Sequence, residues 1–148
     1  MLKISTKGRY GVRFMMDLGA QGDEKIVTLK EVARRQGISE KYLWQVVNPL
    51  KAAGYVRASL GSRGGYSLAK PPAEITLGDI LAVLEGDGPM VACVTDPARC
   101  SRSIGCASRQ IWQEVNDQVD AVLQSVKLSD MIARLQSLAS ESINDYCI

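Results

Sequence analysis

Histidine is absent from this chain of 148 residues, and aromatic residues make up only 5% of it. Without histidine, and without paired carboxylates beside a nucleophile, the sequence lacks the usual groups for general acid–base catalysis, so we do not expect an enzyme. No apolar run approaches the roughly 20 residues of a membrane-spanning helix, and the N-terminus carries no apolar signal core. We therefore expect a cytoplasmic protein with no membrane partner and no small-molecule substrate.

The formal net charge of +2 conceals an uneven distribution of charge along the chain. Residues 1–70 contain 13 Lys and Arg against 5 Asp and Glu, a net charge of +8. Residues 71–148 contain 5 basic and 11 acidic side chains, a net charge of −6. A basic half joined to an acidic half indicates that only the first half meets a polyanion, although a chance division of surface charge is the alternative.

The first expected helix covers residues 5–20, with Ser5 or Thr6 as its cap and apolar residues at helical spacing. One side of this helix is basic and carries Lys7, Arg9 and Arg13. Cationic side chains near a helix N-terminus suit a phosphate group, because the free N–H groups there add to the attraction. For this helix alone, a solvated basic face is an equally good interpretation.

Two further helices joined by a tight turn are expected next. Thr28 and Glu31 have the spacing of a capping box for a short helix that ends near Gly37. Ser39 can cap the following helix, whose outward positions carry Lys41, Gln45 and Asn48, flanked by Tyr42 and Trp44. A short helix, a turn with glycine and a second helix predict a helix-turn-helix, with the second helix placed to read base edges.

A β-hairpin is predicted directly after the helix-turn-helix. Residues 55–60 and 65–68 have the composition of strands, and the linker between them carries Arg63 among glycines. A hairpin in this position is a wing, whose tip can enter a minor groove or lie along phosphates. The expected fold is therefore mainly α with a small β-hairpin wing, with a winged helix-turn-helix domain over residues 1–72.

Residues 73–148 are expected to form a helical dimerisation region that packs with the first domain as one compact unit. Thr76 begins a capping box, a long helix follows Cys106, and Ser129 is the expected cap of a last helix. Apolar residues recur along the long helix at spacings of three and four, namely Trp112, Val115, Val119, Val122 and Val126. This spacing is typical of a seam between two helices, so we expect the chain to form a homodimer.

Three of the four cysteines lie in the segment 92–106, between the two expected functional parts. Cys93, Cys100 and Cys106 are spaced C-x6-C-x5-C in a run without apolar periodicity, which predicts a loop. In the cytoplasm, clustered thiols indicate metal or redox chemistry more often than structural disulfides. The three thiols can converge on one centre, they can hold zinc with one further donor, or Cys100 and Cys106 can form a disulfide.

Several motifs together resemble the IscR-like winged-helix regulators of the Rrf-type family, over nearly the whole chain. They are Ser5-Thr-Lys-Gly-Arg-Tyr10, Ile38-Ser-Glu-Lys-Tyr-Leu43, Gly64-Gly-Tyr-Ser-Leu-Ala-Lys-Pro-Pro72, Ile75-Thr-Leu-Gly-Asp79 and the three-cysteine loop. The resemblance implies a homodimeric bacterial transcription regulator, with repression as its expected mode, that binds a palindromic operator in double-stranded DNA. It also implies an iron–sulfur cluster held by Cys93, Cys100 and Cys106, with 2Fe–2S favoured over 4Fe–4S, and control of cluster-assembly genes.

The resemblance assigns the DNA contacts to a set of polar residues. These are Lys7, Arg9, Arg13, Thr28, Ser39, Lys41, Tyr42, Gln45, Arg57 and Arg63. Two positions depart from the family, because Trp44 replaces a commonly acidic residue and Leu60 replaces an arginine often found at the wing. Trp44 either packs at the helix flank or contacts a thymine methyl group or a sugar, and Arg57 or Arg63 takes over at the wing.

The fourth cluster ligand also departs from the family pattern. Arg109 stands where some relatives supply a histidine, and Arg9 stands where others supply a carboxylate. Asp96, Ser108, Cys147 or an external ligand remain as candidates. Two other interpretations stay open: a cluster-free regulator of the same fold that responds to thiol oxidation or a protein partner in cysteine or sulfur metabolism, and a zinc-stapled interaction module.

Overall fold

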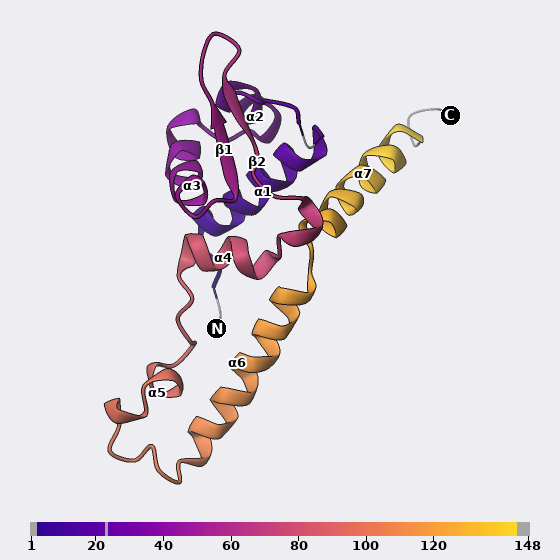
Figure 1. Ribbon diagram of the computed structural model, residues 1–148. Helices are drawn as coiled ribbons and strands as arrows, with labels where there is room; N and C mark the ends of the chain where they lie inside the picture. The colour runs from indigo at the N-terminus through magenta and orange to yellow at the C-terminus, as the bar shows by residue number, and fades with distance from the viewer. Residues whose placement is uncertain (1–2, 23, 145–148) are drawn as a thin grey trace.

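Three helices open the chain, and each begins at a hydroxyl side chain. They are α1 (Thr6–Ala20), α2 (Leu29–Gln36) and α3 (Glu40–Ala52), in a computed structural model that describes residues 3–22 and 24–144 (Figure 1). The hydroxyls of Ser5, Thr28 and Ser39 each accept a backbone N–H of the first helical turn. These bonds satisfy N–H groups that have no partner within a helix, so the three predicted caps are confirmed.

The predicted hairpin is confirmed as an antiparallel pair, β1 (Val56–Ser59) and β2 (Gly65–Leu68). Val27, from the segment before α2, adds a short third bridge, in which Val27 and Tyr66 exchange two backbone hydrogen bonds of 2.8 and 2.7 Å. The chain passes so close there that a Cβ atom on Gly65 would overlap the Val27 backbone. The hairpin is thereby fixed to the helical part, while its tip extends beyond it (Figure 1).

The second half is helical, as predicted, but its boundaries differ in two places. It contains η1 (Pro72–Glu74), α4 (Leu77–Glu85), α5 (Ala92–Thr95), η2 (Pro97–Arg99), α6 (Ala107–Ser125) and α7 (Leu128–Asn144). The cysteine segment is not all loop, because α5 and η2 form single helical turns too short to produce a periodic pattern in the sequence. The last helix begins at Leu128, so Ser129 lies in its first turn and the prediction that it caps the helix is wrong.

One hydrophobic core joins both halves of the chain. Its fully buried members come from several elements and include Phe14, Leu43, Leu50, Ile80 and Leu128. α1 and α4 lie close together, since a Cβ atom on Gly11 would overlap the Leu84 side chain and one on Gly8 would overlap the Glu85 carboxylate. Two glycines one helical turn apart therefore let α1 lie directly against α4.

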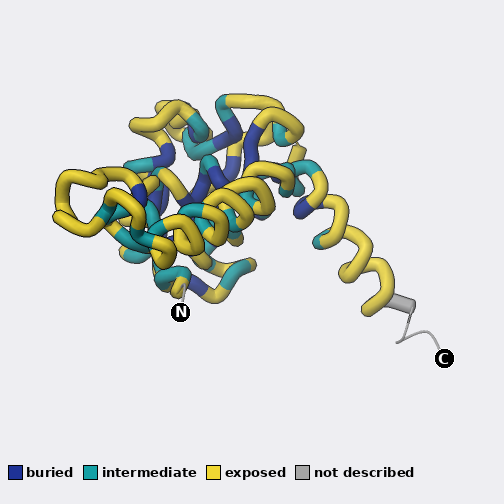
Figure 2. Tube along the Cα trace, turned by 90° about the horizontal axis from the view of Figure 1, so that it is seen from below, coloured by how far each residue is buried: buried dark blue, intermediate teal, exposed yellow. Residues whose placement is uncertain are grey.

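Two long helices leave the body of the molecule. No residue of α6 is buried, and the helix that leads toward the C-terminus is exposed over its outer part (Figure 2). Where α6 ends, the Leu77 N–H donates to the Val126 carbonyl at 2.9 Å and the Leu128 N–H donates to the Ile75 carbonyl at 2.8 Å. These bonds fix the junction of α6 and α7 to the start of α4. Among the described helices, none has the length and apolar character to cross a membrane.

A buried ion pair ties α1 to α2. Asp17 is only 3% exposed, and Arg35 donates to both of its carboxylate oxygens, at 2.7 Å from Nη2 to Oδ2 and 2.9 Å from Nε to Oδ1. The amide of Gln36 adds a third donor at 3.1 Å. A buried carboxylate with several aligned donors is stabilised, whereas one that has lost its partner is strongly destabilising.

We expect Asp17→Asn to lower the free energy of unfolding by about 2–3 kcal/mol, because it leaves the Arg35 guanidinium without a counter-ion next to the core. Chemical denaturation followed by circular dichroism measures the change. Glu24→Gln is the matched control, because Glu24 is exposed and its replacement removes one negative charge from the same half of the chain. Equal stabilities of the two variants would show that the pair contributes no more than a surface charge.

Candidate DNA-binding surface and cysteine segment

One face of α3 is left open by the core. Leu43, Val46, Val47 and Leu50 are buried, and the exposed positions opposite them are Lys41, Trp44, Gln45 and Asn48. These four residues, spaced i, i+3, i+4 and i+7, share one side of the helix and are called the α3 stripe below. The stripe offers an ammonium group, two amides and one indole to whatever binds there.

Trp44 is held by the hairpin rather than by the core. Its ring lies edge-on to the ring of Tyr66 on β2, with 6.3 Å between centroids and an interplanar angle of 87°. Burial raises the pKa of the Tyr66 hydroxyl. Trp44 is nevertheless 48% exposed. Of the two interpretations from the sequence, packing at the helix flank is correct for one edge of the ring, while the rest of the ring remains open.

Four of the predicted DNA contacts have structural roles. The hydroxyls of Thr28 and Ser39 cap helices, and the ring of Tyr42 packs edge-on against Tyr10 with 5.2 Å between centroids. Arg13 donates to the side chain and the backbone carbonyl of Gln36 at the end of α2. The caps at Thr28 and Ser39 follow from the sequence spacing, whereas no spacing in the sequence reveals the bonds from Arg13 to Gln36.

The remaining predicted cations surround the α3 stripe and the hairpin. Arg9 bonds only to the Thr6 hydroxyl, at 3.2 Å, and Lys7 is half-buried on the same helix. Lys41, Arg57 and Arg63 are exposed, and within the described part of the chain none of them has a carboxylate partner. At the hairpin tip, Leu60 is 98% exposed. A polyanion would therefore meet unpaired cations from α3, from β1 and from the turn of the hairpin.

The cysteine segment carries three thiols in different surroundings. Cys93 lies in α5 and is half-buried, Cys100 follows η2 and is exposed, and Cys106 is the residue at which α6 begins. All three thiols are free. The Ser108 hydroxyl, at 3.3 Å from the Cys106 sulfur, and the backbone N–H of Arg109 lower the pKa of Cys106. A lowered pKa gives more thiolate, which is both the metal ligand and the nucleophile.

Arg109 connects this segment to α6. Its guanidinium donates to the backbone carbonyl of Cys93 at 2.7 Å and to that of Val94 at 3.4 Å, and Val94 is only 7% exposed. Arg109 therefore holds α5 against the first turn of α6. No pattern in the sequence indicates this role, because the two carbonyls lie 15 and 16 residues earlier in the chain.

The donor set suits an iron–sulfur cluster in its chemistry, since soft thiolates are the usual ligands. The arrangement does not yet suit one: over residues 3–22 and 24–144, no three His, Cys, Asp or Glu side chains are grouped closely enough to hold a metal ion. Asp96, one candidate for the fourth ligand, pairs with Arg99 at 3.3 Å. Cys147, another candidate, lies outside the described residues.

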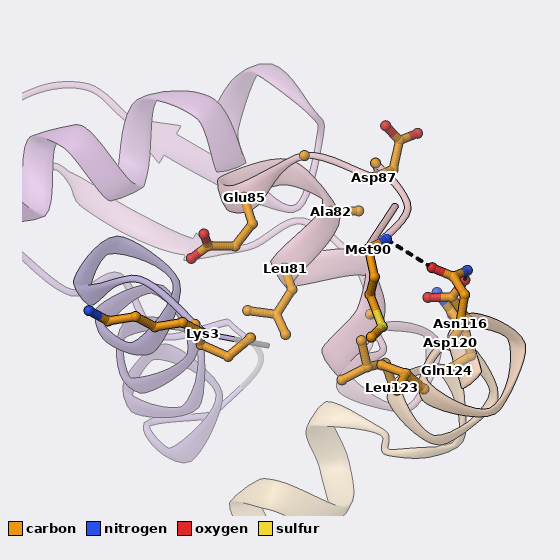
Figure 3. Close-up of a pocket in the computed structure, with 15 residues that line it drawn as sticks. Lys3, Leu81, Ala82, Glu85, Asp87, Met90, Asn116, Asp120, Leu123 and Gln124 are labelled. Carbon is orange, nitrogen blue, oxygen red and sulfur yellow. Dashed lines mark hydrogen bonds between the residues drawn. The ribbon is translucent and has the colours of Figure 1, made fainter. Parts of the chain in front are cut away.

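A cavity of about 430 Å³ separates the winged domain from α6 (Figure 3). It is lined by α4, by the turn that follows α4, by Lys3 and Ile4, and by α6. At one edge Glu85 accepts hydrogen bonds from the Ser5 backbone N–H at 3.1 Å and from its hydroxyl at 2.5 Å. At the other edge the Met90 N–H donates to Asn116 at 3.3 Å (Figure 3). The start of α1, the end of α4 and the middle of α6 thus meet around one cavity.

The outer side of α6 is apolar and has no partner within the described chain. Its exposed residues are Ile111 (56%), Trp112 (42%), Val115 (37%) and Val122 (60%). Val119 is half-buried and lines the cavity instead. Val126, predicted as the end of the seam, lies past the end of α6 and packs against the core of its own chain. The apolar face is therefore shorter than the sequence pattern and includes Ile111 beside it.

Comparison with known proteins places this architecture among characterised regulators. Residues 4–134 match the family model Rrf2, described as an iron-dependent transcriptional regulator. The chain is similar to protein rrf2 of Nitratidesulfovibrio vulgaris, with 37% identity over 88% of this chain and 87% of the relative. Two solved structures share its fold: the global cysteine regulator CymR of B. subtilis (41% identity, TM-score 0.75, 90% of this chain and 98% of that one) and IscR of T. potens (40%, TM-score 0.72, 90% and 88%).

We expect Arg109→Ala to release α5 from α6 without unfolding either the core or α6. Loss of the two bonds from a charged donor corresponds to about 1–2 kcal/mol, so backbone amides of residues 92–95 should exchange with solvent about tenfold faster. Hydrogen exchange read by mass spectrometry measures this directly. Arg102→Ala, an exposed arginine of the same segment, is the control and should leave the exchange unchanged. Unchanged exchange in the Arg109 variant would mean that the two bonds do not restrain the segment.

Proposed function

The chain belongs to the Rrf2 family of transcriptional regulators, and we propose that it binds a palindromic operator as a homodimer and senses iron–sulfur status through its cysteine segment. The observation that carries this proposal is the position of the three thiols. They occupy the segment of chain that joins the winged domain to α6. Cys106 ends this segment and directly precedes the first residue of α6. A ligand bound there would act on both the DNA-binding part and the dimer helix.

The α3 stripe and the hairpin support the DNA-binding part of the proposal. An exposed recognition helix next to a hairpin rich in unpaired cations is the arrangement with which winged helices contact base edges and phosphates. Gln45 and Asn48 carry amides, which can pair with adenine in the major groove, and Lys41 can pair with guanine. Lys7, Arg9, Arg57 and Arg63 are proposed as phosphate contacts, whereas Arg13 acts through α2.

The apolar side of α6 supports the homodimer. A helix of this length, with one apolar side that no described residue of its own chain covers, buries that side when a second copy packs against it. We propose Ile111, Trp112, Val115 and Val122 as the seam. Dimerisation also agrees with the operator, because two identical readers require two half-sites related by a two-fold axis.

Cys93, Cys100 and Cys106 are proposed to hold the cluster, with 2Fe–2S favoured. When bound, a cluster would supply a redox-active and oxygen-sensitive group. The three thiols would have to move together to bind one cluster. The hydrogen bonds from Arg109 to α5 would restrain this movement. Similarity to T. potens IscR and the iron-dependent description of the family model support this signal.

A second signal is supported by a separate observation. The pKa of Cys106 is lowered by Ser108 and by backbone N–H groups, which favours reaction of its thiolate with oxidants. The structural similarity to CymR, described as a global cysteine regulator, agrees with a cluster-free regulator that responds to thiol oxidation or to a protein partner. In both versions the same segment is the sensor.

The dimer and its operator can be tested together with Val115→Asp. A charge on the seam should separate the protomers, and affinity for a two-half-site duplex selected from a random library should fall more than tenfold. Sedimentation gives the oligomeric state, and titration at several salt concentrations gives the affinity. Gln110→Asp introduces the same charge at an exposed, polar position of α6 that lies off the apolar face, and it should change neither. An intact dimer in the Val115 variant moves the interface elsewhere, and no DNA binding by any form ends the proposal.

The cluster can be tested by purification without oxygen. The wild type should absorb visible light and contain iron and sulfide, and Cys93→Ala, Cys100→Ala or Cys106→Ala should lose both, because each removes a thiolate ligand. We expect Cys147→Ala to keep them, and loss of iron and sulfide in this variant would identify Cys147 as the fourth ligand. Far-ultraviolet circular dichroism should stay the same in all four variants. Wild-type protein without iron, combined with DNA affinity that changes on oxidation only when Cys106 is present, would replace the cluster with the second signal.

A further inference from the structure

We infer that Trp44 is a base-reading residue that contacts the C5-methyl group of a thymine in the major groove. The inference rests on the proposed DNA binding and deepens it, because it names the chemical group that is read. It also predicts that a T·A pair is selected at one position of each half-site.

The placement of Trp44 supports this role. It lies in the middle of the α3 stripe, between the outward positions of Lys41 and Asn48 and next to Gln45. With 48% of its surface exposed, it presents an apolar ring among groups that form hydrogen bonds. Because Lys41, Gln45 and Asn48 are exposed beside it, the ring would lie against the same base pairs that these polar groups contact.

The ring is also held in place before any partner arrives. Tyr66 packs against the ring of Trp44 in a T-shaped arrangement, and Tyr66 is itself fixed by its two backbone hydrogen bonds with Val27. A side chain that is already restrained loses little conformational entropy on binding, and tryptophan has only two side-chain torsions to restrain. Trp44 is therefore rigid enough to distinguish a base that carries a methyl group from one that does not.

The chemistry of the major groove leaves one partner for such a ring. Base edges there present hydrogen-bond donors and acceptors, and the only apolar group among them is the thymine methyl. The surrounding cations, Lys41 on α3 and Arg57 and Arg63 on the hairpin, favour a polyanion over an apolar protein surface. A nucleic acid that carries a methyl group in its major groove satisfies both features of this surface.

Replacing thymine with deoxyuridine removes this methyl group and nothing else, so it isolates the contact. In a duplex selected by the wild-type protein, each thymine is replaced in both half-sites at once and the affinity is measured. One position should lose about tenfold in affinity, which corresponds to burial of one methyl group per half-site at about 0.8 kcal/mol each. A second comparison uses cytosine paired with guanine at that position, with and without a 5-methyl group on the cytosine. The methylated pair should bind more tightly, because it returns the methyl group.

Trp44→Ala should bind the thymine and deoxyuridine duplexes equally at that position, and Gln45→Ala should keep the difference while weakening both. Trp44→Leu serves as a second variant if the alanine variant folds poorly, and it should keep part of the difference. Binding of the selected duplex without any sensitive thymine would overturn the inference and leave the proposed DNA binding intact. Persistence of the full difference in Trp44→Ala would assign the methyl contact to another residue. Absence of DNA binding by every form would overturn both proposals.

Discussion

The close contact between α1 and α4 is the constraint on which the arrangement of this molecule depends. Because Gly8 and Gly11 have no side chains, α1 can lie against Leu84 and Glu85 at a separation that a Cβ atom would prevent. The same contact brings the Ser5 cap to the Glu85 carboxylate. The helix that carries the basic residues of the DNA-binding part is thus attached directly to the helix that leads into the cysteine segment.

Local features of this fold could be predicted from the sequence, because they depend on residues near one another in the chain. The caps at Thr28, Ser39 and Thr76 and the hairpin belong to this class. Contacts between distant residues could not be predicted in the same way. Arg109 differs from an ordinary surface arginine only because α5 lies against it, and no local pattern encodes that position.

The candidate site shows the same difference between features set by neighbouring residues and contacts between distant residues. Predicted DNA contacts such as Gln45 and Arg63 are exposed because the apolar period of α3 and the hairpin tip fix their side of the chain. Arg13, whose guanidinium reaches the end of α2, was assigned from spacing alone, and spacing does not reveal a competing carbonyl. The apolar spacing along α6 predicted a face that extends to Val126. The helix ends one residue earlier, at Ser125, and Val126 packs against the core of its own chain.

The two half-exposed tryptophans have an experimental consequence of their own. The chain contains only two, Trp44 on the α3 stripe and Trp112 on the outer side of α6. Their fluorescence depends on solvent contact, so each indole is an intrinsic optical reporter for a different surface. A variant that retains only Trp44 would emit from the recognition helix, and one that retains only Trp112 would emit from the exposed side of α6. Occupancy of the two surfaces can therefore be followed separately in real time, without attaching a dye to any of the cysteines.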